Sequence, residues 1–462
     1  MTTLESLTEY NFGFELAQSI NGMHWIEKIL EERFGHVWRL SEYEKGVKLS
    51  LNGADGSIFF DTGCDSFARA GSSEFPCSFW DAENEGWESV LGKTLPAPGA
   101  LQISSPLIEK NNADHVIHYD ILALVYWMLA RVEEIGREDL DAHDRFPATS
   151  SHAYKNGYLE RPIIDEWLHV LGQVIQRQWP SLILKNHSFN MKVSHDVDQP
   201  SRSGFLTKKQ LIRAVGHHAI KKRDLGNALN SIRVGMNSKK ILHPSDPFNT
   251  FDWIMDLSEE QGLRSAFYFI VGNNDPHDAD YHMSHPAIRA LMNKIDRRGH
   301  ESGLHPSYVT YDKPDTLAYE ADYFRQICAE EDIKLNGLGG RMHYLRWCHP
   351  ATMMALERTG FTYDSSLGYA DSAGFRCGTC FEYPGFNPVS QEALSLRIRP
   401  LIAMECSVMD LAYMGLGNGP EALEKFVSLK NTCRAVGGTF TLLWHNSSIP
   451  GNKNLYRNVL IA

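Results

Sequence analysis

The sequence lacks any long run of apolar residues. Nowhere do about 20 apolar residues follow one another, which is the length that a membrane-spanning helix needs. We therefore expect no transmembrane segment. The first residues, MTTLESLTEYNFGFELAQ, contain early acids and no apolar core of signal length. This pattern predicts a cytoplasmic protein.

Cysteine is sparse, and its positions are scattered. The chain has eight cysteines among 462 residues, and such dispersal favours reduced thiols over the disulfide framework of a small secreted domain. Cys377 and Cys380 form a Cys-x-x-Cys pair in a glycine-rich loop, but no second pair accompanies them. A reduced structural pair is the favoured interpretation.

Positive charge is also in short supply. The formal net charge is -12 and the pI is near 5.9, which argues against a nucleic-acid partner. One stretch departs from this balance, because residues 208–240 contain nine Lys or Arg and a single acid, Asp224. With its helical spacing, this stretch could contact the phosphates of a nucleotide- or lipid-linked sugar or a membrane surface. The favoured interpretation is the solvated face of an inserted helix.

The remaining composition is that of an ordinary globular enzyme, with 43% hydrophobic and 22% charged residues. The chain is long enough for two or three domains, and it divides near residue 185. We expect residues 1–185 to form an accessory α/β domain, with strands at 47–51 and 57–60 and helices at 120–134 and 163–178. A polar loop between these helices contains His143 and Asp144, which we interpret as ordinary loop residues.

Residues 186–462 alternate predicted strands and helices, as a parallel α/β sheet or barrel does. The predicted strands are 188–193, 265–271, 301–305, 361–364 and 439–444. The predicted helices are 251–261, 286–298, 315–331 and 350–359.

The segment KVSHDVDQP, residues 192–200, combines a short apolar strand with two carboxylates. Side chains alternate along a strand, so Asp196 and Asp198 share one side. Two like charges this close repel, and one of them tends to stay protonated or to meet a cation. The pair could supply a general base and a metal ligand, or it could be a turn at the strand end.

Polar residues follow several other predicted strands in the same way. Enzymes with α/β barrels place their catalytic groups at the carboxyl ends of the strands. Such residues at separate strand ends are far more specific together than any one of them. They are Asp196 and Asp198, His305, Arg341 and His343, Asp364, and His445.

The ordered set resembles the polysaccharide deacetylase family, that is, carbohydrate esterase family four and its relatives. SHDVD, RGHESGLHPSY, GRMHYLRW, YDSS and TFTLLWH correspond to its motifs in order, over about residues 188–450. The chain is most similar to a divergent branch with His-Asp-Val-Asp and an N-terminal accessory domain. The resemblance implies a distorted, incomplete β/α barrel.

The resemblance also implies a chemistry and the role of each residue. The family removes an N-acetyl group from a sugar by using a divalent metal, which we expect to be zinc. By resemblance, Asp196 is the base that takes a proton from water, and Arg341 pairs with it. His445 protonates the leaving amine, and Asp364 orients its imidazole. Asp198 is a metal ligand.

The sequence departs from the family pattern at the metal motif. The family has a second His four positions after the first, but Val309 stands four positions after His305. A catalytic zinc usually has three protein ligands, so another residue must complete the set. His343 is the first substitute that we expect, followed by His195.

We therefore expect a sugar N-deacetylase of surface-polysaccharide assembly, acting on an acetamido sugar that is free or linked to a nucleotide or lipid. Peripheral membrane contact and absence of a nucleic-acid partner are part of this expectation. Two alternatives stay open. One is a carbohydrate-binding barrel that has lost its metal, and the other is a related enzyme that acts on linear amides or formyl groups.

Overall fold

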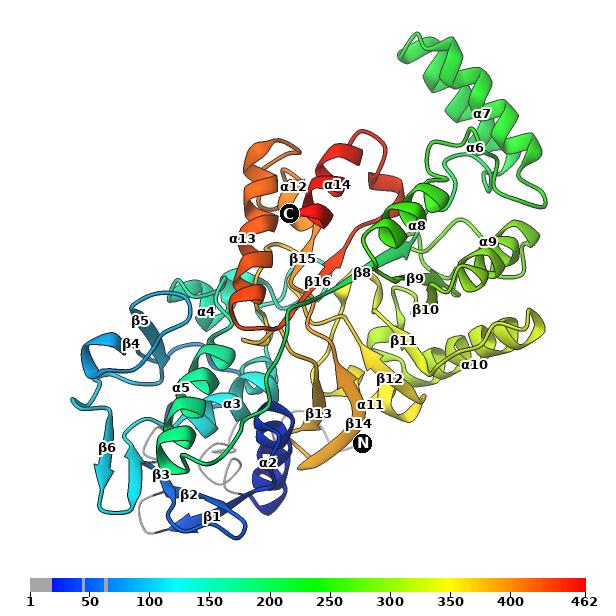
Figure 1. Cartoon of the computed structure of the whole chain (residues 1–462). Helices are drawn as coiled ribbons and strands as arrows, with labels where there is room; N and C mark the ends of the chain where they lie inside the picture. The colour runs from blue at the N-terminus through cyan, green and yellow to red at the C-terminus, as the bar shows by residue number, and fades with distance from the viewer. Residues whose placement is uncertain (1–18, 44–45, 62–64) are drawn as a thin grey trace.

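The computed structural model describes residues 19–43, 46–61 and 65–462 (Figure 1). Its elements form an amino-terminal part with a five-stranded sheet and a carboxy-terminal part with a nine-stranded sheet. The expected mixed α/β class is confirmed. The division into separate domains near residue 185 stays a prediction. Within the described ranges, no helix is both long and apolar enough to cross a bilayer.

The five-stranded sheet of the amino-terminal part has the order β1-β2-β3-β7-β6, and a separate hairpin pairs β4 with β5. The strands expected at 47–51 and 57–60 correspond to β2 and β3. The elements are α2 (Ile20–Phe34), β1 (Trp38–Tyr43), β2 (Gly46–Leu51), β3 (Ile58–Asp61), β4 (Cys77–Asp81), β5 (Thr94–Pro98), β6 (Ile108–Asn111), β7 (Asp114–Ile117), α3 (Ile121–Leu129), α4 (His152–Lys155) and α5 (Ile163–Gln178).

The two long apolar helices expected in this part are present. Helix α5 has the expected bounds, whereas α3 ends at Leu129 instead of continuing to residue 134. The reason is local: Arg131 adopts a left-handed backbone conformation with φ 50°, and a 3-10 turn over Val132–Glu134 follows it. Every residue of α3 is buried, which accounts for its uninterrupted apolar sequence.

The nine-stranded sheet has the order β13-β14-β12-β11-β10-β9-β8-β16-β15. All neighbouring strands are parallel except the antiparallel pair β13 and β14. The strands are β8 (Asn190–Val197), β9 (Ser265–Ile270), β10 (Glu301–His305), β11 (Leu338–Gly340), β12 (Phe361–Asp364), β13 (Tyr383–Asn387), β14 (Glu392–Ile398), β15 (Ala403–Met404) and β16 (Thr439–Leu443).

The sheet is curled but open, with β13 and β15 as its edges in the described part of the chain (Figure 1). Strand β9 is buried along its whole length, as expected where helices cover a parallel sheet. The helices of this part are α6 (Lys208–Gly216), α7 (Leu225–Asn237), α8 (Phe251–Glu260), α9 (Pro286–Arg297), α10 (Pro314–Glu330), α11 (Ala351–Arg358), α12 (Glu405–Met409), α13 (Pro420–Ala435) and α14 (Lys453–Ile461).

The two parts of the chain share an interface through α2. The Trp25 ring stacks on Phe386 of β13 with centroids 4.8 Å apart, and its indole N–H donates to the carbonyl of Pro384 at 2.9 Å. Glu32 pairs with Arg397 of β14 at 2.8 Å. The buried apolar residues of both parts form one continuous cluster. The amino-terminal part therefore braces the β13–β14 edge of the larger sheet.

Candidate active site

The carboxyl ends of the parallel strands bring the predicted site residues to one edge of the nine-stranded sheet. This follows from the topology, since parallel strands end on the same side. Asp196 and Asp198 lie at the end of β8, His305 ends β10, Arg341 and His343 follow β11, Asp364 ends β12, and His445 follows β16.

Arg341 and Asp196 form a buried ion pair at the centre of this edge. The Nη1 atom of Arg341 lies 2.8 Å from Oδ1 of Asp196, and both side chains are almost completely buried. The guanidinium also donates to the Ser365 carbonyl at 2.8 Å and to the Ser194 hydroxyl at 2.9 Å. Arg341 is therefore fixed on three sides, and it fixes one oxygen of Asp196. The other oxygen, Oδ2, lies 3.5 Å from Nε2 of His305.

Asp198, His305 and His343 converge as the sequence predicted. Oδ1 of Asp198 lies 3.4 Å from Nε2 of His305, and Oδ2 lies 3.9 Å from Nε2 of His343. One ligand atom from each of the three residues lies within 4.8 Å of the others. The two histidines are buried, whereas the Asp198 side chain keeps 28% of its surface exposed. Asp198 therefore marks the open side of the cluster.

The hydrogen bonds around this cluster leave its ligand atoms available. Nδ1 of His305 lies 2.5 Å from the backbone carbonyl of Arg341, and because a carbonyl only accepts, Nδ1 carries the proton. Nε2 of His305 is therefore the ring nitrogen that is left to bind a metal in exchange for its proton. Oδ1 of Asp198 is buried but accepts no hydrogen bond from the described residues. Burial opposes ionisation, yet the surrounding histidines lower the pKa of Asp198 below its usual range.

One carboxylate and two imidazoles with free nitrogens are the donor set of a catalytic zinc site. The unsatisfied oxygen of Asp198 supports the same assignment, because a buried carboxylate oxygen without a donor is costly unless a cation meets it. Behind His343, Nδ1 lies 3.4 Å from Oδ1 of the buried Asp278. A carboxylate behind a ligating histidine orients its ring. These residues fit a divalent metal.

Glu405 is the partner of His445, and sequence reasoning missed it. Nδ1 of His445 lies 2.6 Å from Oε1 of Glu405, and Nε2 lies 3.4 Å from Oδ2 of Asp198. Burial opposes a charge on this imidazole, yet the Glu405 carboxylate raises the pKa of His445 well above its usual value. Glu405 therefore favours the protonated form of His445, whose Nε2 faces the metal-ligand cluster.

The predicted pairing of Asp364 with His445 was wrong. Asp364 accepts instead from the backbone N–H and the hydroxyl of Ser366, at 2.9 and 2.5 Å. The Ser366 hydroxyl oxygen in turn accepts from the N–H of Met342 at 2.8 Å. Burial raises the pKa of Asp364 to about 6. Asp364 thus holds the segment that connects Arg341 to His343, and it does not touch the imidazole of His445.

His195, the second substitute ligand that the sequence offered, points away from the cluster. It precedes Asp196 in β8, so its side chain lies on the opposite face of the strand. Its Nδ1 lies 2.6 Å from the Trp444 carbonyl, and its ring stacks on Phe267 with centroids 5.0 Å apart. His195 therefore packs between strand and helix and is not placed to bind the same ion.

A second group of residues with metal-binding side chains lies next to the cluster of Asp198, His305 and His343. It consists of Glu405, Cys406 and His445. The Cys406 sulfur lies 4.0 Å from Nδ1 of His445. Burial raises the pKa of the Cys406 thiol to about 11, and zinc is bound by thiolates. Oε1 of Glu405 is already engaged by the backbone N–H and the ring of His445. This group therefore serves to orient His445.

The loop between the two amino-terminal helices lies against the site. The His143 ring contacts Tyr344, with centroids 4.8 Å apart, and its carbonyl accepts from Arg346 at 2.9 Å. Arg145 donates to the Tyr344 carbonyl at 3.1 Å. Tyr344 and Leu345 adopt left-handed conformations with φ 60° and 57°, which cost about 1–3 kcal/mol each. The loop that we interpreted as unremarkable therefore braces the strained turn after His343.

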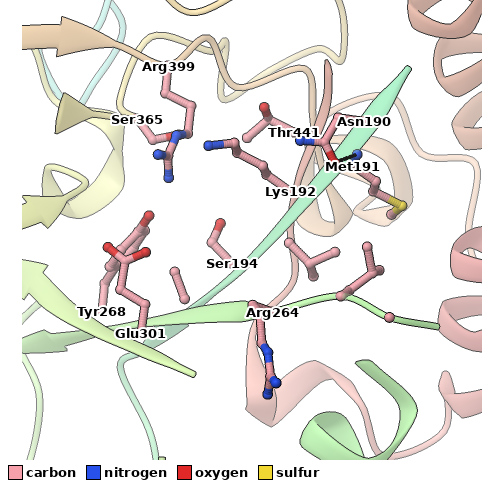
Figure 2. A pocket seen from close by; sticks show the side chains of 14 residues that line it. Asn190, Met191, Lys192, Ser194, Arg264, Tyr268, Glu301, Ser365, Arg399 and Thr441 are labelled. Carbon is pink, nitrogen blue, oxygen red and sulfur yellow. Dashed lines mark hydrogen bonds between the residues drawn. The ribbon is translucent and has the colours of Figure 1, made fainter. Parts of the chain in front are cut away.

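A cavity of about 280 Å³ lies at the amino-terminal ends of β8 and β10, away from the metal-ligand cluster. Figure 2 shows Lys192 and Arg399 with their charged ends turned toward it. Both pair with Glu382, at 2.8 and 2.5 Å respectively. Ser194 and Ser365 line this cavity and also bind Arg341. Arg341 thus contacts two of the residues that line this cavity.

Comparisons with known proteins give weak similarities. A profile described as a family of unknown function (DUF7033) matches residues 27–180, which is less than half of the chain. No curated protein matches. A structure assigned as a polysaccharide deacetylase from Mycobacterium smegmatis is 17% identical, with a TM-score of 0.39, over 60% of this chain and 84% of its own.

Two further structures are similar at the same level. The Puue allantoinase is 13% identical with a TM-score of 0.34, over 60% of this chain and 84% of its own. A structure assigned as a polysaccharide deacetylase from Pseudomonas aeruginosa PAO1 is 11% identical, with a TM-score of 0.35, over 61% of this chain and 86% of its own. Similarity at this level assigns neither a substrate nor an activity to this chain.

Proposed function

We propose that this protein is a metal-dependent hydrolase that removes the acetyl group from an acetamido sugar. One arrangement carries the proposal: a carboxylate held by Arg341 and an imidazole held by Glu405 both lie next to a metal-ligand set. Asp196 is held by Arg341 at 2.8 Å, and Nε2 of His445 lies 3.4 Å from Asp198. The ordered deacetylase-like motifs in the sequence support the amide as the bond that is cleaved.

Asp198, His305 and His343 would hold the metal, which we propose is zinc. When bound there, a divalent metal lowers the pKa of water and polarises a carbonyl. Asp196 accepts the proton of the attacking water, since one of its oxygens is free of Arg341. Arg341 holds that carboxylate in place through the ion pair at 2.8 Å. In this assignment three residues bind the metal, Asp196 is the base, and Arg341 positions that base.

His445 completes the reaction by donating a proton to the leaving amine. Its charge is supported by Glu405 at 2.6 Å, and its Nε2 faces the same open side as Asp198. An acid with this proton and a base such as Asp196 divide the work of amide hydrolysis between them. The convergence of His343 with Asp198 and His305 favours this catalytic proposal over a carbohydrate-binding barrel without metal.

We further propose that the substrate is an acetamido sugar, free or attached to a nucleotide or lipid carrier, in surface-polysaccharide assembly in the cytoplasm. The resemblance of the motifs supports this substrate class. The amide chemistry of the site would also serve a linear amide or a formyl group, so the choice between these substrates needs an experiment.

The test measures the release of acetate from acetamides and of formate from formamides by the purified protein, first stripped of metal with a chelator and then given zinc, cobalt or manganese. The substrates are N-acetylhexosamine oligosaccharides, nucleotide-linked N-acetylhexosamines, linear acetamides and formamides. We expect metal-dependent acetate release from a sugar, and release that is slower by about 100-fold or more from the Asp196→Asn variant. Turnover of only linear amides would replace the sugar by another substrate. Carbohydrate binding without acetate release, whichever of the three metals is added, would contradict a catalytic role.

A further inference from the structure

Helices α6 (Lys208–Gly216) and α7 (Leu225–Asn237) form a hairpin that projects from the carboxy-terminal part of the chain, beyond α8 and α9 (Figure 1). The two helices pack closely, since an added Cβ at Gly235 would lie 2.8 Å from the Leu211 side chain. The hairpin takes no part in the proposed active site, and its surface shows a pattern of its own.

The outer face of α7 is more apolar than its packed face. The buried residues are mostly small: Ala228, Ser231 and Val234. The large apolar residues are exposed instead: Leu225 67%, Leu229 67%, Ile232 37% and Met236 63%. Spacings of four, three and four residues place these side chains on one helix face. Helix α7 thus turns toward solvent the stripe that a globular helix usually buries.

Further large apolar side chains of the same hairpin are exposed. Ile212 of α6 is 73% exposed, and Ile220, in the helical turn His217–Lys221 that follows α6, is 82% exposed. Ile241, which follows α7, is 59% exposed. Single exposed apolar residues are common, but a concentration of this kind on one projecting segment marks an interaction surface.

The hairpin is also the basic region of an acidic protein. Residues 208–240 contain nine Lys or Arg and one acid, which gives 9 − 1 = +8 against −12 for the whole chain. All nine basic side chains are exposed, and none lies within 4 Å of a carboxylate of the described residues. The single acid, Asp224, caps α7 by accepting from the N–H of Asn227 at 2.9 Å. The positive charge is therefore free to meet a negatively charged partner.

We propose that this hairpin binds the surface of a membrane that contains anionic lipids. Exposed apolar side chains that enter the acyl boundary, together with Lys and Arg that meet lipid phosphates, are the features of interfacial helices. The helices have 9 and 13 residues, fewer than the about 20 that a spanning helix needs, so they lie along the surface. A second hairpin of the same charge would repel this one, which disfavours pairing between copies.

The proposal is tested by sedimentation of the full-length protein with vesicles. One preparation contains phosphatidylcholine alone, and the other contains phosphatidylcholine with phosphatidylglycerol. We expect binding to the anionic vesicles to be at least about tenfold tighter and to weaken as salt is added. Equal binding to both preparations, or binding to neither, would overturn the proposal.

Paired variants assign the binding to the hairpin. Leu229→Asp with Met236→Asp removes two apolar contacts, and Lys221→Glu with Lys222→Glu reverses two charges. We expect each pair to weaken vesicle binding by at least about tenfold. The matched controls are exposed residues elsewhere, Leu101→Asp with Ile183→Asp and Lys93→Glu with Lys110→Glu, which should bind like the wild type. Control variants that lose binding as much as the hairpin variants would refute the assignment.

Two readouts make the result independent of folding and of the proposed hydrolase activity. The chain already contains ten tryptophans, so the signal is the difference in emission between the Leu229→Trp variant and the wild type. This difference spectrum should shift to the blue when anionic vesicles are added, and no shift would contradict insertion. Light scattering without lipid should show the same mass for the wild type and for the Leu229→Asp, Met236→Asp pair. A wild-type dimer that this pair dissociates, without vesicle binding, would assign the surface to a second copy and overturn the proposal.

Discussion

Oδ1 of Asp198 lies 3.4 Å from Nε2 of His305, across the ends of β8 and β10. The strands between and around them are parallel, so a carboxylate that ends one strand and an imidazole that ends another meet at the same edge. His343 reaches the same point from the turn after β11. The structure thus has the proximity that the sequence predicted for Asp198 and His305.

The first expectation concerns metal affinity. Asp198→Ala, His305→Ala and His343→Ala should each lower zinc affinity by more than about 100-fold, because loss of an outer hydrogen bond alone costs about 10–100-fold. Competition with a chromogenic chelator measures the affinity. His282→Ala, which removes an exposed histidine outside the cluster, is the control and should bind zinc like the wild type. Unchanged affinity of the His343 variant would remove it from the ligand set.

The second expectation separates the base from the ligands. Asp196→Asn should lower turnover by about 100-fold or more, the usual scale for general base catalysis, while zinc affinity changes little. Adding His445→Ala should cost less than the product of the two single losses, because both groups act in one site. Steady-state acetate release and chelator competition give the two readouts.

Asp196→Asn also tests the buried ion pair. Arg341 is completely buried, so the substitution leaves a guanidinium without its carboxylate, and breaking such pairs costs about 3–5 kcal/mol of stability. Activity should therefore be measured well below the unfolding temperature of the variant. Wild-type turnover in a folded Asp196→Asn protein would contradict its role as the base.

The third expectation concerns pH-dependent stability at Asp120, the buried N-cap of α3. Its carboxylate accepts from the N–H of Ala123, and burial raises its pKa to about 7. In the unfolded chain this pKa is about 3.9. Between these two values the folded state binds the extra proton, so this contribution to the free energy of unfolding falls as the pH rises from about 4 to 7.

Asp120→Asn keeps the cap oxygen but removes the titration. From pH 5 to pH 8 the variant should become more stable than the wild type by a further 2 to 3 kcal/mol, roughly two pH units at 1.36 kcal/mol each. Urea unfolding at the two pH values measures the change. Asp315→Asn, an exposed acid in the first turn of α10, is the control. A difference that is constant between pH 5 and pH 8 would show that Asp120 does not titrate in this range.

The bounds of several elements were predictable from the sequence. Helix α5 has 16 residues, enough for its apolar spacing to show its extent. Strands β10 and β12 also have the expected bounds, although β10, with the sequence ESGLH, contains few apolar residues. Strands β11 and β15 have three and two residues, too few for any periodicity to appear. Glu405 follows directly after β15, so nothing local identified it as a site residue.

The pairing of residues across the sheet could not be predicted, because it depends on strand order. Asp364 and His445 both lie at strand ends, and the sequence gives no rule for which of them are neighbours. In the sheet, β12 is separated from β16 by β11, β10, β9 and β8, whereas β15 lies directly beside β16. This order places Glu405, and not Asp364, next to His445.

The last expectation follows from this neighbour. Glu405→Gln keeps the size of the side chain and removes the charge that raises the pKa of His445. The imidazole must be protonated to act as the acid, so activity is lost as the pH rises through its pKa. The variant should therefore lose activity at a lower pH than the wild type does, and it should turn over more slowly at neutral pH.

The pH profile of kcat distinguishes this role from a structural one, since a loosened fold lowers activity at every pH without moving the limb. Asp364→Asn is the matched comparison, because Asp364 is equally buried but bonds Ser366. We expect the alkaline limb to stay in place for Asp364→Asn and to move to lower pH for Glu405→Gln. A shift with Asp364→Asn and none with Glu405→Gln would restore the pairing that the sequence predicted and contradict the one at 2.6 Å.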